Sequence, residues 1–254
     1  MGGGRGTAVI TVLVPPGVVT PGAAAGRRER LDDAEQHHLR VRRAHEGERV
    51  ALRDGAGLVG IGRIAIVGKA WEVEIENAER HTRPAALTLA VGAGDRERFG
   101  WVVEKAAELG ATRIVPLVTA RAGDVATRVR DSHVEKLRRQ ALEATKQCGA
   151  AWAVEVDEPA ALAAFIERNE IERNEPGLRW LADAAGDAPP ATLDGVAVTI
   201  VVGPEGGLED QERAALLGAG FRPLALAAHT LRFETAALAA AATVSTARLR
   251  GTHG

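Results

Sequence analysis

The sequence has a single cysteine, Cys148, among 254 residues, so no internal disulfide bond can form. This usage is typical of a reducing compartment, and we expect the protein to be cytoplasmic. One cysteine and seven scattered histidines, with no CxxC or HxxxH pair, argue against a structural zinc site. No apolar run approaches the ~20 residues of a membrane-spanning helix, and no signal-peptide pattern is present. We therefore predict neither a metal nor a membrane as partner.

Aromatic residues are scarce and tyrosine is absent, so few side chains are available to stack on nucleobases. The net charge of -2 argues against indiscriminate binding of polyanions, although totals hide local patches. Residues 27–43 carry six arginines against four acids, and residues 121–146 carry seven Lys or Arg against four acids. Taken alone, each stretch is interpreted as a solvated helix face. Beside a ligand-binding loop, both become candidates for contacts with a polyanion.

The pattern of apolar and polar residues changes near residue 80. Residues 7–80 contain short apolar runs separated by glycine-containing turns, which predicts a small, mainly β domain with a hairpin turn at Asp54-Gly55. One helical stretch, 29–44, interrupts it and would place Leu31, Ala34, His38 and Val41 on one face. The segment "RHTRPAA" resembles a linker. We expect an amino-terminal domain at 1–80 and a second domain at 81–254.

Beyond the linker, strands and helices alternate, which predicts an α/β domain with a mostly parallel sheet and helices on both faces. One helix should end at Gly110 in the C′ position, and another should begin at the capping residue Asp131 and end at Gly149. The second helix would share one apolar face among Val134, Leu137, Ala141, Ala144 and Cys148. Cys148 is therefore expected in the core and not as a nucleophile.

The stretch "TIVVGPEGGLEDQE" (199–212) runs an apolar strand into a glycine-rich loop and a helix start. In an open α/β sheet such loops hold the ligand. Neither the P-loop nor the Rossmann glycine spacing is present, and the carboxylate of Glu205 would repel a phosphate at a helix N-terminus. The loop suits a ligand without phosphate, either neutral or cationic, such as S-adenosylmethionine. The alternative is a tight turn in which Glu205 is merely an acid at a helix start.

A second loop has the same pattern. The strand "RPLALA" leads through "AHTLRFET" into an alanine-rich helix, with Arg232 and Glu234 at its start. These two residues are either a surface pair that contributes little or groups that hold a ligand or a nucleobase.

At these loops the sequence resembles the RsmE-type 16S ribosomal RNA uracil-N3 methyltransferases of the SPOUT superfamily. The matching motifs are "VGPEGGL", "LRFETA", "GDRERFGWVVEKAAELGATRIVPLVTAR", "EATKQCG" and "HHLRVRRAHEGERVALRDG", which cover nearly the whole chain. Three positions depart from the usual pattern. Phe233 replaces a threonine, Ala150 an arginine and Arg42 a leucine.

The resemblance implies a PUA-like RNA-binding domain, a trefoil-knotted SPOUT domain, a homodimer, S-adenosyl-L-methionine as cofactor and small-subunit 16S rRNA as substrate, methylated at N3 of the uridine numbered 1498 in standard rRNA numbering. Arg232 would be the catalytic cation, with Glu205 or Glu234 as the orienting or accepting carboxylate. Cofactor contacts are expected from Leu181, Ala182, Val202, Gly203, Pro204, Glu205, Gly206, Gly207, Leu226, Leu231 and Arg232. Phosphate contacts are expected from Arg40, Arg42, Arg43, Arg121, Arg138 and Arg139.

Two other functions remain open at this point. A non-catalytic RNA-binding assembly factor would keep the SPOUT domain only for dimerisation, although it would have no need of the glycines and the acid of GPEGG. A phosphate-binding α/β enzyme is disfavoured because the loop lacks a Lys and a Ser or Thr and contains Glu205.

Overall fold

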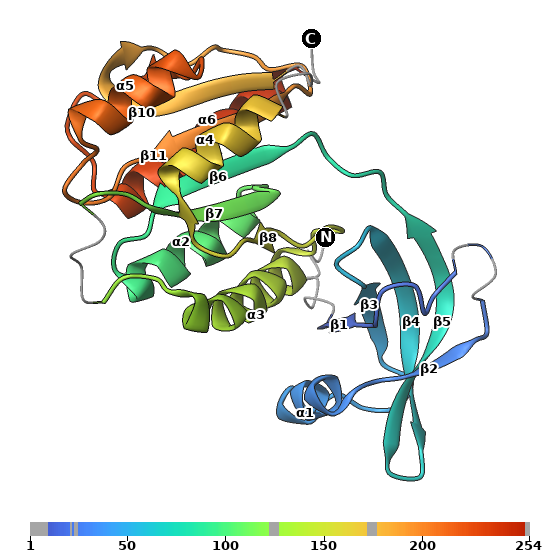
Figure 1. Ribbon diagram of the computed structural model, residues 1–254. Helices are drawn as coiled ribbons and strands as arrows, with labels where there is room; N and C mark the ends of the chain where they lie inside the picture. Colours follow the sequence, from blue (N-terminus) through green and yellow to red (C-terminus); the bar gives the residue numbers. More distant parts are fainter. Residues whose placement is uncertain (1–9, 21, 23–24, 122–126, 172–176, 252–254) are drawn as a thin grey trace, which may run out of the picture. The chain divides into compact units, whose positions relative to one another are not determined.

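The computed structural model describes residues 10–20, 22, 25–121, 127–171 and 177–251 (Figure 1). The chain divides into two compact units. The amino-terminal unit comprises Met1–Arg83 together with Thr145–Ala153, and the carboxy-terminal unit comprises Pro84–Ala144 together with Val154–Gly254. Each unit has its own hydrophobic core.

The amino-terminal unit is built around a five-stranded sheet in the order β1-β3-β4-β5-β2. Its β1–β3 pair is parallel, and the other pairs are antiparallel. Its elements are β1 (Ile10–Leu13), β2 (Arg28–Arg30), α1 (Asp33–Val41), β3 (Arg49–Arg53), β4 (Leu58–Val67) and β5 (Ala70–Arg80). The predicted hairpin joins β3 to β4, and the Asp54 carboxylate accepts hydrogen bonds from the backbone N–H groups of Ala56 and Leu58 at 2.7 and 2.8 Å. This domain is mainly β, as expected.

Helix α1 forms within the predicted stretch, but it buries a different face. Its buried residues are Glu35, Gln36 and Leu39, whereas the expected core residue Val41 is 67% exposed. The apolar-periodicity prediction was wrong here because two polar side chains find buried partners. Gln36 donates a hydrogen bond to the carbonyl of Leu31 at 2.8 Å, and Glu35 forms an ion pair.

The partner of Glu35 is Lys146, whose ammonium lies 2.6 Å from one carboxylate oxygen and 2.9 Å from the other. Both side chains are almost fully buried. Burial raises the pKa of Glu35 above its ordinary value, and the ammonium of Lys146 opposes that rise. The pair fixes the segment 145–153 within the amino-terminal unit, where Arg53 also donates to the carbonyl of Gly149 at 3.0 Å.

The carboxy-terminal unit contains a sheet in the order β12-β10-β11-β6-β7-β8, with β9 paired to β7, and its recorded strand pairs are all parallel. The rhythm of alternating strands and helices is therefore confirmed. The strands are β6 (Leu87–Gly92), β7 (Arg113–Val118), β8 (Glu155–Val156), β9 (Ala160–Ala161), β10 (Gly177–Asp187), β11 (Ala197–Val202) and β12 (Arg222–Leu224). The helices are α2 (Arg96–Glu108), α3 (Asp131–Cys148), α4 (Leu162–Ile171), α5 (Asp210–Gly218) and α6 (Phe233–Gly251).

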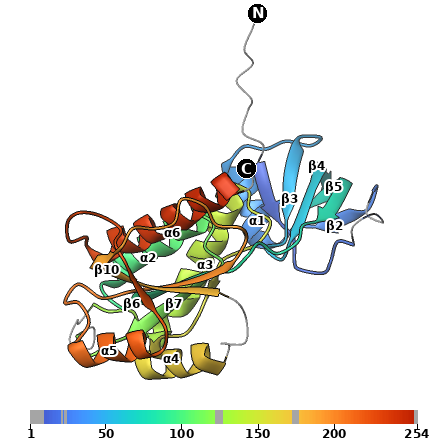
Figure 2. The ribbon, with the colours of Figure 1, turned by 90° about the horizontal axis from the view of Figure 1, so that it is seen from above.

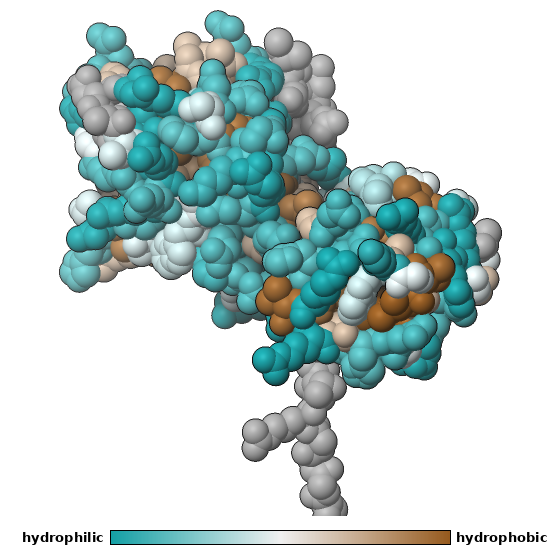
Figure 3. Space-filling model, turned by 90° about the horizontal axis from the view of Figure 1, so that it is seen from below, coloured by the Kyte–Doolittle hydropathy of each residue, from teal (hydrophilic) through white to brown (hydrophobic). Residues whose placement is uncertain are grey.

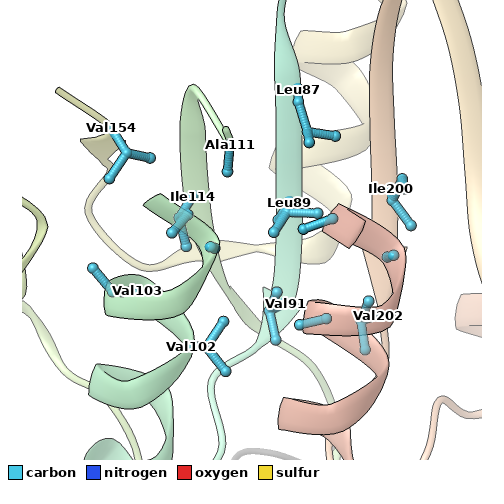
Figure 4. Close-up of a cluster of buried hydrophobic side chains, with 14 of the residues drawn as sticks. Leu87, Leu89, Val91, Val102, Val103, Ala111, Ile114, Val154, Ile200 and Val202 are labelled. Atoms are coloured by element: carbon cyan, nitrogen blue, oxygen red, sulfur yellow. The ribbon is translucent and has the colours of Figure 1, made fainter. Parts of the chain in front are cut away.

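Helices cover both faces of this sheet, as Figure 2 shows, with α2, α3 and α6 on one side and α4 and α5 on the other. Successive side chains along a strand point to opposite faces of the sheet. Leu89 and Val91 of β6 join the cluster packed against α2 and α6 (Figure 4), whereas Ala90 joins the cluster on the α4 and α5 side. Burial on both faces explains the continuous apolar runs of the strands.

The end of α3 differs from the prediction. Four of the five expected residues, from Val134 to Ala144, are buried, but Cys148 is exposed. In the last turn the buried positions are Thr145 and Lys146, so the ion pair with Glu35 sets the orientation there. Asp131 is the first helical residue, and the helix stops before Gly149, which has a φ of 75°.

The face shown in Figure 3 is mostly hydrophilic, with hydrophobic side chains in limited areas. The described helices include none that is long and apolar enough to cross a membrane. In the same part of the chain, no group of three or more His, Cys, Asp or Glu residues is placed to hold a metal ion.

The buried pair generates a stability prediction. Lys146→Met leaves the Glu35 carboxylate buried without its counter-charge, which should cost about 3–5 kcal/mol. The double variant Glu35→Leu/Lys146→Met removes both charges and should recover most of that loss. Urea unfolding, with hydrogen exchange of β3 to β5 as the local readout, measures both effects. Lys105→Met, at an exposed ion pair of α2, is the control and should change little. A double variant as unstable as the single one would contradict the argument.

Candidate active site

Three loops follow neighbouring parallel strands at one edge of the sheet in the carboxy-terminal unit. Strand β10 lies between β12 and β11, so the residues after β11 and β12 and the carboxyl end of β10 come together. In open α/β sheets this edge is where ligands bind. The glycine-rich loop follows β11 at this edge, and the loop after β12 leads from it into the alanine-rich helix α6.

A cavity of about 130 Å³ opens between the end of β10 and the loop that follows β12. Most of its lining is apolar, and its polar side chains are Asp183, His229 and Thr230. The lining residues are Ala182, Asp183, Ala184, Leu226, Ala227, His229, Thr230, Leu231 and Ala236. An apolar cavity with a few convergent polar groups is typical of a small-molecule site.

Asp183 is the acid of this cavity, and its orientation is fixed from two sides. Arg213 of α5 donates a hydrogen bond from Nε to Oδ2 at 3.0 Å and forms an ion pair with the same oxygen through Nη2 at 2.8 Å, and the backbone N–H of Ala185 donates to Oδ1 at 2.9 Å. The hydrogen bond from Ala185 and the guanidinium of Arg213 lower the pKa of Asp183 below its ordinary value. Asp183 is therefore ionised at neutral pH.

The GPEGG loop, Gly203–Gly207, turns its acid away from this cavity. The Glu205 carboxylate lies against the backbone of Gly94, and the N–H of Asp95 approaches Oε1 at 3.5 Å. Gly207 has a φ of 73° and donates its N–H to the carbonyl of Pro204 at 2.8 Å. In the described chain, Glu205 thus connects the loop after β11 to the loop after β6.

Glycine at 92 permits this approach. A Cβ at Gly92 would lie 2.8 Å from the Cα of Pro204, a distance that real Cβ atoms essentially never show. Gly206 is similarly packed, because the side chain of Arg121 lies over it and donates from Nη1 to its carbonyl at 2.7 Å. The glycines therefore serve close packing among loops.

The start of α6 holds the other two predicted catalytic residues. Glu234 is 8% exposed, and its Oε1 lies 3.6 Å from Nη1 of Arg98 on α2. Its other oxygen, Oε2, is buried and has no hydrogen-bond partner among the described residues. Arg232 is exposed, and its carbonyl accepts the first helical hydrogen bond from Ala236. Phe233 is buried in the hydrophobic core, so the chain has a packing residue at this position.

The predicted phosphate-binding arginines fall into two groups. Arg121 and Arg138 have partners within their own unit, since Arg138 binds Glu135, Glu158 and the carbonyl of Val156. Arg42 and Arg43, at the end of α1, and Arg139, on α3, are exposed. Arg40 is also exposed and donates to Gln36 at 3.3 Å.

The structure thus brings together some of the expected cofactor residues. Ala182, Leu226 and Leu231 line the cavity, whereas Leu181 and Val202 are buried in the core and residues 203–207 lie outside the lining. Asp183 was missed as a lining residue. A polar residue directly after the apolar stretch "LRWLA" is the signal that could have identified Asp183.

Comparison with known proteins decides the family. The family described as RNA methyltransferase domain matches residues 81–245, well over half of the chain. The chain belongs to this RNA methyltransferase family. The RNA methyltransferase PUA domain matches residues 31–75, within the amino-terminal unit.

Individual relatives agree with this assignment. Ribosomal RNA small subunit methyltransferase E of Synechocystis sp. is 26% identical over 233 residues, covering 90% of this chain and 76% of the relative. A methyltransferase of Legionella pneumophila, solved with bound S-adenosylmethionine, superposes with a TM-score of 0.76 at 28% identity, covering 92% and 96% of the two chains. Ribosomal RNA small subunit methyltransferase E of Neisseria gonorrhoeae superposes with a TM-score of 0.79, covering 92% and 96%, and at 24% identity it shows the fold.

The predicted fold class is confirmed for this RNA methyltransferase. It has a mostly parallel, helix-covered sheet in its RNA methyltransferase domain and a separate PUA-like domain.

The contact between Gly92 and Pro204 can be tested. Gly92→Ala forces a methyl group into the Pro204 backbone, so we expect about 1–3 kcal/mol of destabilisation, a typical cost of overpacking. Gly218→Ala is the matched control, because a Cβ at Gly218 meets nothing within 4 Å and alanine favours the helix. Urea denaturation compares the two variants. Equal stability of the two would contradict the crowding described here.

Proposed function

We propose that the protein is an S-adenosylmethionine-dependent methyltransferase that acts in the cytoplasm on N3 of one specific uridine of 16S rRNA. The observation that carries this proposal is the joint match of a PUA domain followed by an RNA methyltransferase domain, in a chain related along most of its length to small-subunit rRNA methyltransferases. The motifs GPEGG and LRFETA, which indicated uracil N3 chemistry by resemblance, both lie at the ligand-binding edge of the sheet.

The residues of this edge fit a nucleoside that carries no phosphate. The cavity is mostly apolar, its ionised group is an acid, and no Lys or Arg of the described chain lines it. Ala182, Leu226 and Leu231 would contact the nucleoside half of S-adenosylmethionine, while Val202–Gly207 would border it through their backbone. When bound, this cofactor supplies an electrophilic methyl group on a positively charged sulfur.

The cavity measures about 130 Å³, less than the roughly 300 Å³ at the lower end for ligand pockets. One chain therefore encloses only part of such a cofactor. This supports the proposal that a homodimer completes the site, in a trefoil-knotted SPOUT domain. Trp101 of α2, which is 47% exposed, and Leu249 of the neighbouring helix α6, which is 61% exposed, are apolar groups suited to that interface.

Arg232 is the residue proposed to act on the uracil. Removal of the N3 proton places negative charge on O2 and O4, and a cation beside these oxygens lowers the barrier. The side chain of Arg232 is exposed next to the loop that lines the cavity, and no ion pair engages it among the described residues. Glu234, with one oxygen held near Arg98 and one without a partner, is the better placed carboxylate to accept a proton or orient a donor. Glu205 instead supports the loop.

Methyl transfer to small ribosomal subunits, with the product located by mass spectrometry, tests the function. The wild type should add one methyl group at N3 of a single uridine, and 16S rRNA from a strain without the protein should lack it. Arg232→Ala should reduce the rate about a hundredfold or more. Arg222→Ala, an exposed arginine at the opposite end of β12, should leave the rate unchanged. No transfer by the wild type would refute the function, and an unimpaired Arg232→Ala would refute the role of Arg232.

The arginines after α1 give a prediction for RNA binding. Arg42 and Arg43 are exposed on the PUA-like domain, and each neutralised phosphate contributes ~0.7–0.9 to the slope of log affinity against log salt. Arg42→Ala/Arg43→Ala should therefore weaken binding of 16S rRNA fragments and flatten that slope by about 1.5.

The matched control removes the same charge elsewhere on this domain. Arg49→Ala/Arg63→Ala deletes two arginines that both pair with Glu76. It should change the slope much less. Identical slopes for the two double variants would mean that the end of α1 does not contact RNA phosphates.

A further inference from the structure

Among the residues that line the cavity, Asp183 can accept a further hydrogen bond. A carboxylate offers about four lone-pair positions. Two accept hydrogen bonds, from the N–H of Ala185 at 2.9 Å and from Nε of Arg213 at 3.0 Å, and Nη2 of Arg213 forms an ion pair with Oδ2 at 2.8 Å. The side chain is 21% exposed and lines the cavity, so the remaining position is available to a ligand there.

The ion pair with Arg213 decides which donor suits this acceptor. Its guanidinium donates one hydrogen bond to Oδ2 and forms an ion pair with the same oxygen, and together the two groups carry no net charge. A neutralised carboxylate attracts a further cation weakly, but it still accepts a hydrogen bond from a neutral hydroxyl or amino group. Asp183 is thus poorly suited to select a positively charged sulfur.

We propose that Asp183 accepts a hydrogen bond from a neutral donor of the cofactor's nucleoside half, either a ribose hydroxyl or the adenine amino group, and that Arg213 is its positioning residue. The inference rests on the proposed function. An acid that follows the apolar part of a parallel strand and binds a nucleoside hydroxyl is a known solution in α/β folds. An acid was expected to recognise the cofactor at Glu205. In this proposal the acid is Asp183, whose carboxylate lines the cavity.

Calorimetry with S-adenosylmethionine and S-adenosylhomocysteine tests the inference without an activity assay. Asp183→Asn replaces the ionised acceptor with an amide, so affinity for both ligands should fall by the same factor, about tenfold to a hundredfold. Asp187→Asn, the same change further along β10 and outside the cavity, is the control and should bind like the wild type. A loss confined to S-adenosylmethionine would mean that Asp183 recognises the sulfonium, and the inference would be wrong.

A series of adenosine analogues identifies the donor and uses the wild-type protein. Adenosine, 2′-deoxyadenosine, 3′-deoxyadenosine and purine riboside, which lacks the amino group, compete with bound S-adenosylhomocysteine. One analogue should bind the wild type about tenfold more weakly than adenosine does. The same analogue and adenosine should bind Asp183→Asn with equal affinity, because the coupling is lost with the carboxylate. Equal affinity of all four for the wild type would overturn the inference, even if the variant failed to fold.

Arg213→Gln separates positioning from contact. It should lower affinity for both cofactor forms less than Asp183→Asn does, because the acceptor stays but loses its fixed orientation. An effect of Arg213→Gln with none of Asp183→Asn would also overturn the proposal. A wild type that binds neither ligand would refute the proposed function itself, whereas normal binding by both variants would refute only the role of Asp183.

Discussion

The site depends on the close approach of two backbones, at Gly92 and Pro204. Strands β6 and β11 are neighbours in the sheet, and the chain after β11 crosses directly over the end of β6, where any side chain at position 92 would overlap it. This crossing places Glu205 against Gly94 and orients the turn that ends at Gly207. The loop that resembles a phosphate-binding turn is therefore a packed element, and its carboxylate has a partner inside the protein.

The two carboxylates predicted for the site, Glu205 and Glu234, both lie near the first turn of α2. Glu205 lies against the Gly94–Asp95 backbone that leads into this helix, and Glu234 lies near Arg98, one turn further on. Asp95 caps the same turn by accepting hydrogen bonds from the N–H groups of Glu97 and Arg98, which lowers its pKa. The loops after β6 and β11 and the start of α6 thus all make contacts at the start of this helix.

Sequence patterns predicted the fold because its signals are local. Strands with continuous apolar runs, glycines with positive φ at 110 and 149, and the Asp54-Gly55 turn all formed as expected. The errors arose where a residue distant in the sequence determines which side chains are buried. Val41 and Cys148 are exposed, whereas Glu35 and Lys146 on the same two helices are buried as an ion pair, 111 residues apart in the sequence. Periodicity cannot detect such a pair. For the same reason the cavity lining was only partly identified, since Asp183 gains its role from Arg213.

Charge counts along the chain, like apolar periodicity, do not reveal partners that are distant in the sequence. Residues 121–146 seemed as promising for RNA as residues 27–43, but Arg121 and Arg138 are held by a loop carbonyl and by Glu135 and Glu158. An arginine that already has a partner must lose it before it can bind a phosphate, which removes much of the gain. Arg42 and Arg43, exposed after the end of α1, face no such cost in the described structure. The distribution of internal partners, which only the fold reveals, therefore separates arginines that stabilise the protein from those free to bind RNA.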